Sequence, residues 1–284
     1  TPLYSSAASD VYKRQSNEGD ELAIHIHTLQ WNGCSRWVQC TEQNACRAIV
    51  STPMDIFRSH FGEAPKSARM GWNFMSNATM QQLEADGVSY DASCIPGFYS
   101  GLMYGGRDNF FDWSRAQSLP YHPCYHDYQV PGTMKILEIP VTTYKSRNLY
   151  ATARNLFPHW IRAISGFGSL ASVGATMSRF PIHSLTRMLA FQDEFLVFSP
   201  WRSNVGITKL LSLKRSESTL NGWSYLLGYF HPCELLDPID GKPNLDYLRI
   251  LRLALRRILG VQDSINVVPV TLSEFGRMFR DGVL

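Results

Sequence analysis

Residues 65–93 read PKSARMGWNFMSNATMQQLEADGVSYDAS, and this segment decides the class of fold. KSARMGW predicts a short strand, and NATMQQLEADG predicts a helix that Gly87 ends, because glycine readily takes the left-handed conformation found where helices stop. VSYDASCIPG, which begins at Val88, then predicts a second strand with a turn behind it. The segment is therefore one strand-helix-strand unit.

The residues upstream extend the same alternation. Residues 42–61 predict a helix that ends at Gly62, and residues 21–31, ELAIHIHTLQW, open with a short β-type run after the turn at Gly19 and Asp20. Strands that alternate with helices in this way favour a parallel sheet or barrel of the α/β class. Ligand sites in such folds form at the carboxyl ends of the strands.

The first predicted strand carries His25 and His27. Side chains two residues apart in a strand point to the same side, so two imidazoles share one face. A metal ion is one reason for that pairing, because imidazole is the commonest protein ligand for metals. The alternative is that Leu22, Ile24 and Ile26 pack in the core while the histidines face solvent or a polar layer.

Downstream, residues 97–134 are rich in aromatic side chains and lack a regular period. A long irregular segment inside a domain is typical of a loop that forms a site, and its aromatic rings suit stacking on sugars; the alternative is a loop whose aromatics pack on one another. The remaining predicted elements are a strand at 135–144, mostly helix at 155–192, a strand and loop at 224–237, a helix at 244–259, and a strand followed by a helix at 266–279.

The composition excludes several classes of protein. The 284 residues are 44% hydrophobic and 18% charged, which suits one sizeable core, and the net charge of +3 is too small and too dispersed to indicate a nucleic-acid partner. The six cysteines form no C-x-x-C pair, so free thiols in a reducing compartment are expected. No apolar run is long enough to span a bilayer.

The first fifteen residues look foreign to the protein. DVYKRQ, residues 10–15, back-translates to a sequence that resembles the transposase mosaic end used as a sequencing adapter. We therefore expect residues 1–15 to be an adapter scar and residues 16–284 to be a single catalytic domain that lacks its native N-terminus. We expect a cytoplasmic protein, with export left open because that N-terminus is missing.

Several motifs, in order and spacing, resemble those of the polysaccharide deacetylases, a family of metal-dependent glycan deacetylases. The motifs are GDELAIHIHT, PKSARMGWNFMSNATMQQLEADGVSYDAS, FDW, PYHP, LEIPVT, GYFHPCEL and VTLSEF, and they extend from Gly19 to the C-terminus. The resemblance implies a distorted, incomplete (β/α) barrel whose first strand is missing here. It also implies hydrolysis of the acetyl amide of an N-acetylated sugar or polysaccharide, with a divalent metal, zinc first, as cofactor.

The resemblance assigns roles residue by residue. His25 corresponds to the first metal histidine, and His27 is offered as the second, although the family spaces the pair four apart, where this chain has Leu29. Arg69 corresponds to the arginine that orients the catalytic aspartate. Asp112 stands in the aspartate-tryptophan motif, and His231 corresponds to the general acid.

Four further residues are candidates for contact with the glycan. Trp72 follows the arginine motif, Trp113 corresponds to the tryptophan that lines the acetyl pocket, and Tyr121 and His122 lie in the aromatic segment. For His122, substrate contact and simple bonding within a turn are equally open.

One departure bears on activity. The family has an Asp-Asp motif upstream of the metal histidines, and no such pair precedes His25 in this chain. The general base and one metal ligand are therefore expected to lie outside this chain. We predict that the chain as it stands is inactive while the parent protein is an enzyme.

Two other functions remain open. H-x-H followed by threonine also resembles the first strand of amidohydrolase barrels and of related metal-dependent phosphoesterases, which need further ligands on later strands. A glycan-binding pseudoenzyme would keep the fold and the aromatic segment without catalysis. The oligomeric state is not predicted.

Overall fold

The structure is a computed structural model, and it describes residues 3–34, 37–98, 111–146, 192–195, 222–231, 235–236, 241–259 and 267–284. Contacts divide the chain into two units, of which one comprises Thr1–Thr142 with Leu196–Leu284 and the other Thr143–Phe195. In the second unit, β9 (Thr143–Ser146) and β10 (Gln192–Phe195) form an antiparallel pair. The predicted helical stretch at 155–192 lies outside the described residues, apart from Gln192. All that follows concerns the first unit.

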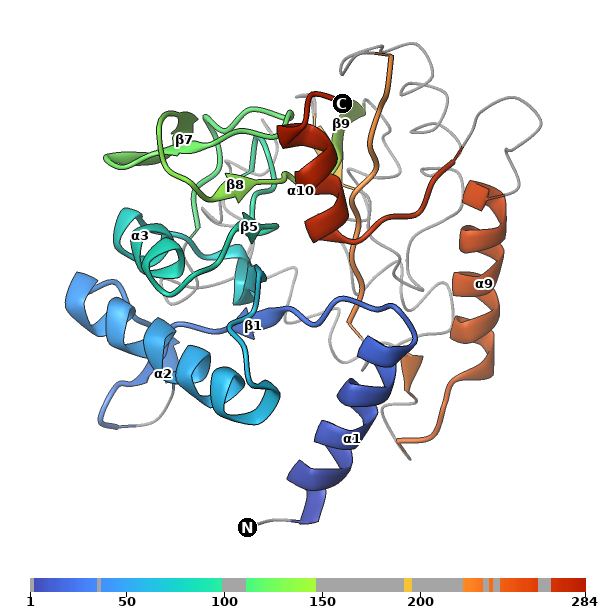
Figure 1. Cartoon of the computed structure of the whole chain (residues 1–284), viewed down its shortest axis with the longest axis horizontal. Coiled ribbons are helices and arrows are strands. Elements are labelled where there is room, and N and C mark those ends of the chain that lie inside the picture. Colours follow the sequence, from blue (N-terminus) through green and yellow to red (C-terminus); the bar gives the residue numbers. More distant parts are fainter. Residues whose placement is uncertain are drawn as a thin grey trace, which may run out of the picture. The chain divides into compact units, whose positions relative to one another are not determined.

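A parallel sheet in the order β1-β4-β5-β8 forms the centre of the first unit. Its strands are β1 (Ile24–Ile26), β4 (Ser67–Met70), β5 (Tyr90–Asp91) and β8 (Leu137–Glu138), and each neighbouring pair is parallel. The chain passes from β1 through α2 (Gln43–Phe61) to β4, and from β4 through α3 (Asn77–Ala85) to β5 (Figure 1). The predicted α/β class and its parallel sheet are confirmed, whereas the described strands do not show a barrel.

The helices end where the sequence places their stop signals. Gly62 follows α2 with φ 80° and donates its N–H to the carbonyl of Arg58, and Gly87 lies just past α3 with φ 98°. Both glycines hold left-handed conformations that cost other residues free energy. At the start of α3, the Ser76 hydroxyl accepts the N–H of Thr79 and so satisfies one of the free donors of the first turn.

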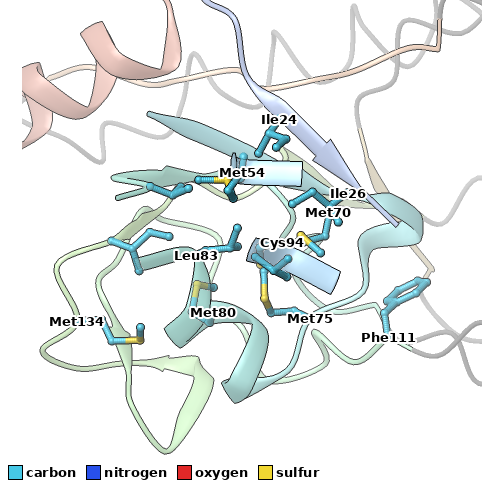
Figure 2. Packing of buried hydrophobic residues seen from close by; sticks show 14 of the residues in the cluster. Ile24, Ile26, Met54, Met70, Met75, Met80, Leu83, Cys94, Phe111 and Met134 are labelled. Carbon is cyan, nitrogen blue, oxygen red and sulfur yellow. The ribbon is translucent and has the colours of Figure 1, made fainter. Parts of the chain in front are cut away.

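The main core lies between the sheet and helices α2 and α3. Ile24 and Ile26 of β1 pack with a group of methionines that includes Met54, Met70 and Met80, all buried (Figure 2). Methionine is flexible enough to fill irregular space, so this composition suits a helix–sheet interface. A second cluster packs α10 (Leu272–Arg280) against Tyr90 and Leu137.

The other elements only partly match the expected ones. The structure adds α1 (Leu3–Asn17), the hairpin β2 (Leu29–Trp31) with β3 (Trp37–Gln39), the short 3-10 turn η1 (Gly71–Asn73), and the hairpin β6 (Pro123–Cys124) with β7 (Asp127–Pro131). It also contains the expected helix α9 (Leu245–Leu259). The helices predicted at 244–259 and near the C-terminus are confirmed. The segment 97–134 was predicted as loop, and that prediction was wrong for β6 and β7, because a tight turn pairs two short runs that have no clear alternation.

The cysteines of the described residues, Cys34, Cys40, Cys46, Cys94 and Cys124, are free thiols. None of the helices in the described part of the chain combines the length and apolar content that crossing a bilayer requires.

Candidate functional site

His25 and His27 lie on one face at the end of β1. Ile24 and Ile26 on either side of His25 are buried, so the period of two in the strand turns both imidazoles away from the main core. The two ring centroids are 5.0 Å apart, and the rings stand at 81° to each other. The sequence predicted the shared face, and the structure adds that the rings are direct neighbours.

Gly71 and Trp72 surround the second histidine. A Cβ atom at position 71 would lie 2.3 Å from Cγ of His27, so the imidazole rests on the backbone of the glycine. The Trp72 ring meets the same imidazole edge to face, with 5.1 Å between centroids, and Trp72 is 42% exposed. The site therefore has an accessible aromatic wall beside His27.

An unusual turn places Trp72 there. Trp72 and Asn73 both have positive φ, 53° and 57°, in the left-handed region that side chains with a Cβ rarely adopt. Such a conformation costs on the order of 1 kcal/mol or more per residue and persists only where the surroundings enforce it. Here Trp113 Nε1 donates to the Asn73 carbonyl at 2.9 Å, and Arg69 Nη2 donates to Asn73 Oδ1 at 2.7 Å.

Arg69 is the last residue but one of β4 and lies beside His25, its register partner. Its Nη1 donates to the carbonyl of Ala92, and its guanidinium carbon lies 3.7 Å from the centroid of the Tyr229 ring, a cation–π contact. Burial lowers the pKa of Arg69, while Tyr229 and then Asp91 oppose the shift. Carbonyl, amide and aromatic partners therefore hold this guanidinium in place.

Both candidate metal histidines are held neutral at pH 7. The pKa of His25 is lowered to about 4, first because protein replaces much of the water around the ring, and then because a proton on His27 and the charge of Arg69 each disfavour a further positive charge beside them. The same loss of water, followed by the charge of His231, lowers the pKa of His27. Neutral imidazole is the form whose nitrogen lone pair binds metals or accepts a proton.

His231 joins the histidine pair from a distant part of the chain. It is an electrostatic neighbour of both His25 and His27, so the predicted general acid lies near the predicted metal histidines. The ring of Tyr229 is perpendicular to that of His231, with 5.8 Å between centroids. Residues 232–234, the rest of the FHPCE motif, lie outside the described residues.

His25 and His27 could supply two imidazole ligands to a metal ion. A catalytic zinc usually has three protein ligands and one open position. Across the residues that the structure describes, no group of three or more histidine, cysteine, aspartate or glutamate side chains is arranged to hold a metal ion. His25 and His27 thus fit part of such a site, and the described residues do not complete it.

Asp112 and Trp113 have structural contacts. The Asp112 Oδ1 atom accepts from the N–H and hydroxyl of Ser114, and its carbonyl accepts from the Tyr128 hydroxyl at 2.7 Å. Trp113 is 0% exposed and packs edge to face on Tyr128. In this conformation Trp113 supports the turn at Asn73 from inside the core, so it presents no surface to a substrate.

Tyr121 and His122 lie beside β8. Tyr121 is buried and forms an antiparallel β-bridge with Glu138. Its hydroxyl donates a hydrogen bond to the Tyr128 carbonyl at 3.0 Å. His122 is exposed, with Nδ1 3.0 Å from the carbonyl of Ile136. This contact joins residues 14 apart in sequence, so it is not the bonding within a turn that the sequence offered as an alternative, and for Tyr121 burial favours a role in the core.

Sequence reasoning missed several residues of this region. Tyr229, Asn73 and Gly71 had no role assigned, and neither had the two buried acids Asp91 and Glu138. For the acids a signal was present, because each is a lone carboxylate in a short apolar strand, and a buried charge needs a partner.

Comparisons with known proteins give little further information. No family model matches the chain, and no curated protein matches it. Among solved structures, one from Mycobacterium smegmatis described as a "putative polysaccharide deacetylase" is similar, with a TM-score of 0.45 and 16% sequence identity over 97% of this chain and 68% of that one. At this level of likeness, the case for function rests on the site itself.

Proposed function

We propose that the protein is a hydrolase of the polysaccharide deacetylase type that removes the acetyl group of an N-acetylated sugar. The observation that carries this proposal is the convergence of His25, His27, Arg69 and His231, which come from three separate parts of the chain. The family resemblance assigns all four residues to one catalytic site, which supports the proposal. A distorted barrel built around the parallel sheet is part of the same proposal.

The location of the group supports a role in binding or catalysis. His27 directly follows the last residue of β1, and the turn Gly71–Asn73 directly follows β4. Both lie at the carboxyl end of a parallel strand, which is where α/β folds bind their ligands. Trp72 adds an exposed ring suited to one face of a sugar.

In the proposed reaction, water adds to the acetyl carbonyl, the C–N bond breaks, and acetate and a free amine result. His231 would donate the proton that the leaving nitrogen takes up, a role suited to imidazole near pH 7. Arg69 would supply a fixed positive charge beside the histidines. We assign no base among the described residues, since the side chain of Asp112 holds its own turn.

A divalent metal, zinc first, belongs to the proposal as well. His25 and His27 would bind it through their neutral imidazoles. When bound, such an ion would polarise the acetyl carbonyl and lower the pKa of water.

The test is acetate release from N-acetylated sugars, free, polymeric and nucleotide-linked, with zinc or cobalt supplied. It compares the chain as given with the product of the gene read from its start codon. For the active form, His231→Ala should lower turnover by roughly 10²- to 10⁴-fold with bound metal unchanged. His60→Ala, which removes an exposed histidine of α2, is the control and should have no effect. Acetate release that is unchanged in His231→Ala would overturn the assigned role, and no release from either form would overturn the activity.

A second candidate is a glycan-binding protein without catalysis. The observation that favours it is the two-histidine donor set among the described residues, one ligand short of a usual catalytic zinc site. Sugar binding by calorimetry that depends on Trp72, together with no acetate release from either form, would support it.

A further inference from the structure

Two acids lie side by side in the interior of the sheet. Asp91 of β5 and Glu138 of β8 are register partners in the parallel ladder, and both are 0% exposed. Carboxylates are rarely buried this completely unless they are paired, hydrogen-bonded or protonated. Neither acid has a role in the proposed reaction.

The hydrogen bonds around the pair satisfy all but one of the carboxylate oxygens. Asp91 accepts twice from Ser93, through the hydroxyl at 2.8 Å and the backbone N–H at 3.2 Å. Glu138 Oε1 accepts the N–H of Cys94 at 3.0 Å, while Glu138 Oε2 is buried and receives no hydrogen bond from any of the residues that the structure describes. An ionised oxygen would be costly in that position, but a protonated one can donate to the neighbouring carboxylate of Asp91.

The balance of charge around the pair also indicates that one of the two acids is protonated. Arg69 brings a single positive charge to this region, and its electrostatic partners include both Asp91 and Glu138. Two ionised acids would leave a net negative charge away from water, whereas one shared proton makes the group of three neutral. With one proton, the pair therefore carries a single negative charge, which balances the single positive charge of Arg69.

We propose that Asp91 and Glu138 share one proton, carried by Glu138, and that the negative charge remaining on Asp91 holds the guanidinium of Arg69 at the candidate site. Asp91 and Glu138 are in this sense positioning residues that act through Arg69. The inference concerns the charge state of the site and does not depend on the proposed reaction.

The protonation tendencies agree with this assignment. Burial raises the pKa of Glu138 well above its ordinary value, and the adjacent charge of Asp91 raises it further. Burial also raises the pKa of Asp91, but hydrogen bonds from Glu138 and Ser93 and the charge of Arg69 oppose that shift.

The other titratable groups that face the pair are uncharged near pH 7. They are the thiol of Cys94 and the phenols of Tyr121 and Tyr225, and burial is the first cause that raises the pKa of each. Among the described titratable groups that act on the two acids, Arg69 is the cation that balances them.

Three variants, two single and one double, separate the possible charge states through thermal unfolding. Glu138→Gln and Asp91→Asn each leave one acid, which can be the single counter-charge, so each should unfold near the melting temperature of the parent. The double variant leaves Arg69 without a counter-charge, and its melting temperature should fall by about 10 °C. Asp55→Asn combined with Glu63→Gln, which removes two exposed acids, is the matched control and should change little.

Adding Arg69→Met distinguishes a charge effect from lost packing. In the parent background Arg69→Met should lower the melting temperature, whereas in the Asp91→Asn/Glu138→Gln background it should raise it. If the double variant melts like the parent, or Arg69→Met lowers the melting temperature in both backgrounds, the counter-charge assignment is wrong.

Infrared spectroscopy with ¹³C-carboxyl labels locates the proton without any activity assay. At pH 7, label in glutamate should shift the carbonyl band of one protonated carboxylic acid, and that band should vanish in Glu138→Gln. A band that shifts with labelled aspartate would place the proton on Asp91, and no protonated band would mean that both acids are ionised; either result overturns the proposal.

Discussion

Gly71 lies directly against the imidazole of His27, so closely that a Cβ atom at position 71 would stand 2.3 Å from Cγ of the ring. A contact of that length is shorter than van der Waals packing permits, so only glycine, which has no Cβ, fits at position 71. The glycine of the Arg-x-Gly-Trp motif thus determines where the second histidine of the pair can lie.

Gly71→Ala should displace the His27 ring and destabilise the protein by roughly 1–3 kcal/mol, the usual cost of overpacking. The measurement is the free energy of unfolding in urea. Because the clash is with the ring, the double variant Gly71→Ala/His27→Ala should lose less stability than the sum of the two single variants. Additive losses would show that the backbone at position 71, and not the imidazole, is the sensitive element.

Metal binding tests the histidine pair. Equilibrium dialysis with zinc should show affinity reduced at least about tenfold by His25→Ala and by His27→Ala, because each removes a proposed ligand. His60→Ala should bind as the parent does. Full zinc affinity in His27→Ala would assign the second ligand position to another residue.

The pKa of His25 predicts a specific dependence of stability on pH. Its value in the folded protein, about 4, lies below the ordinary 6.5, so the unfolded chain takes up the proton first as the pH falls. The free energy of unfolding should therefore decrease between about pH 6.5 and about pH 4, and this group should contribute no change above that range. The lowered pKa of His27 acts in the same direction.

Urea unfolding at a series of pH values measures this slope. His25→Asn should make the decrease toward acid pH shallower, while His60→Ala leaves it unchanged. An equal slope in His25→Asn and the parent would mean that the imidazole of His25 titrates alike in the folded and unfolded chain.

Trp72 and Trp113 were both predicted to contact the glycan, and the structure gives them different surroundings. Trp72→Gly should weaken sugar binding without loss of stability, since the backbone there has φ 53°, which glycine tolerates well. Trp113→Phe should cost about 1–3 kcal/mol of stability, because the Asn73 carbonyl loses its buried donor. Calorimetric sugar titration and urea unfolding, with Trp37→Ala as an exposed control, would separate the two roles. Weaker sugar binding in Trp113→Phe at unchanged stability would instead favour a glycan contact.

Local features of the fold were predictable from the sequence alone. The helix ends at Gly62 and Gly87 follow from the backbone freedom of glycine, and the shared face of His25 and His27 follows from the period of a strand. The hairpin at β6 and β7 was not predictable in this way, because its pairing depends on a turn between two runs that lack alternation.

The sequence by itself determined the alternation of strand and helix from β1 to β5, the side of β1 that carries the imidazoles, and the residue types available for the site. The tertiary structure alone decided which of these residues meet. Tyr229 covers Arg69, Trp113 enters the core, and Glu138 lies beside Asp91. The physical reason is that conformational preferences and hydrogen-bonding periods act over a few neighbouring residues, whereas burial and electrostatic coupling depend on the packing of strands and loops far apart in the chain.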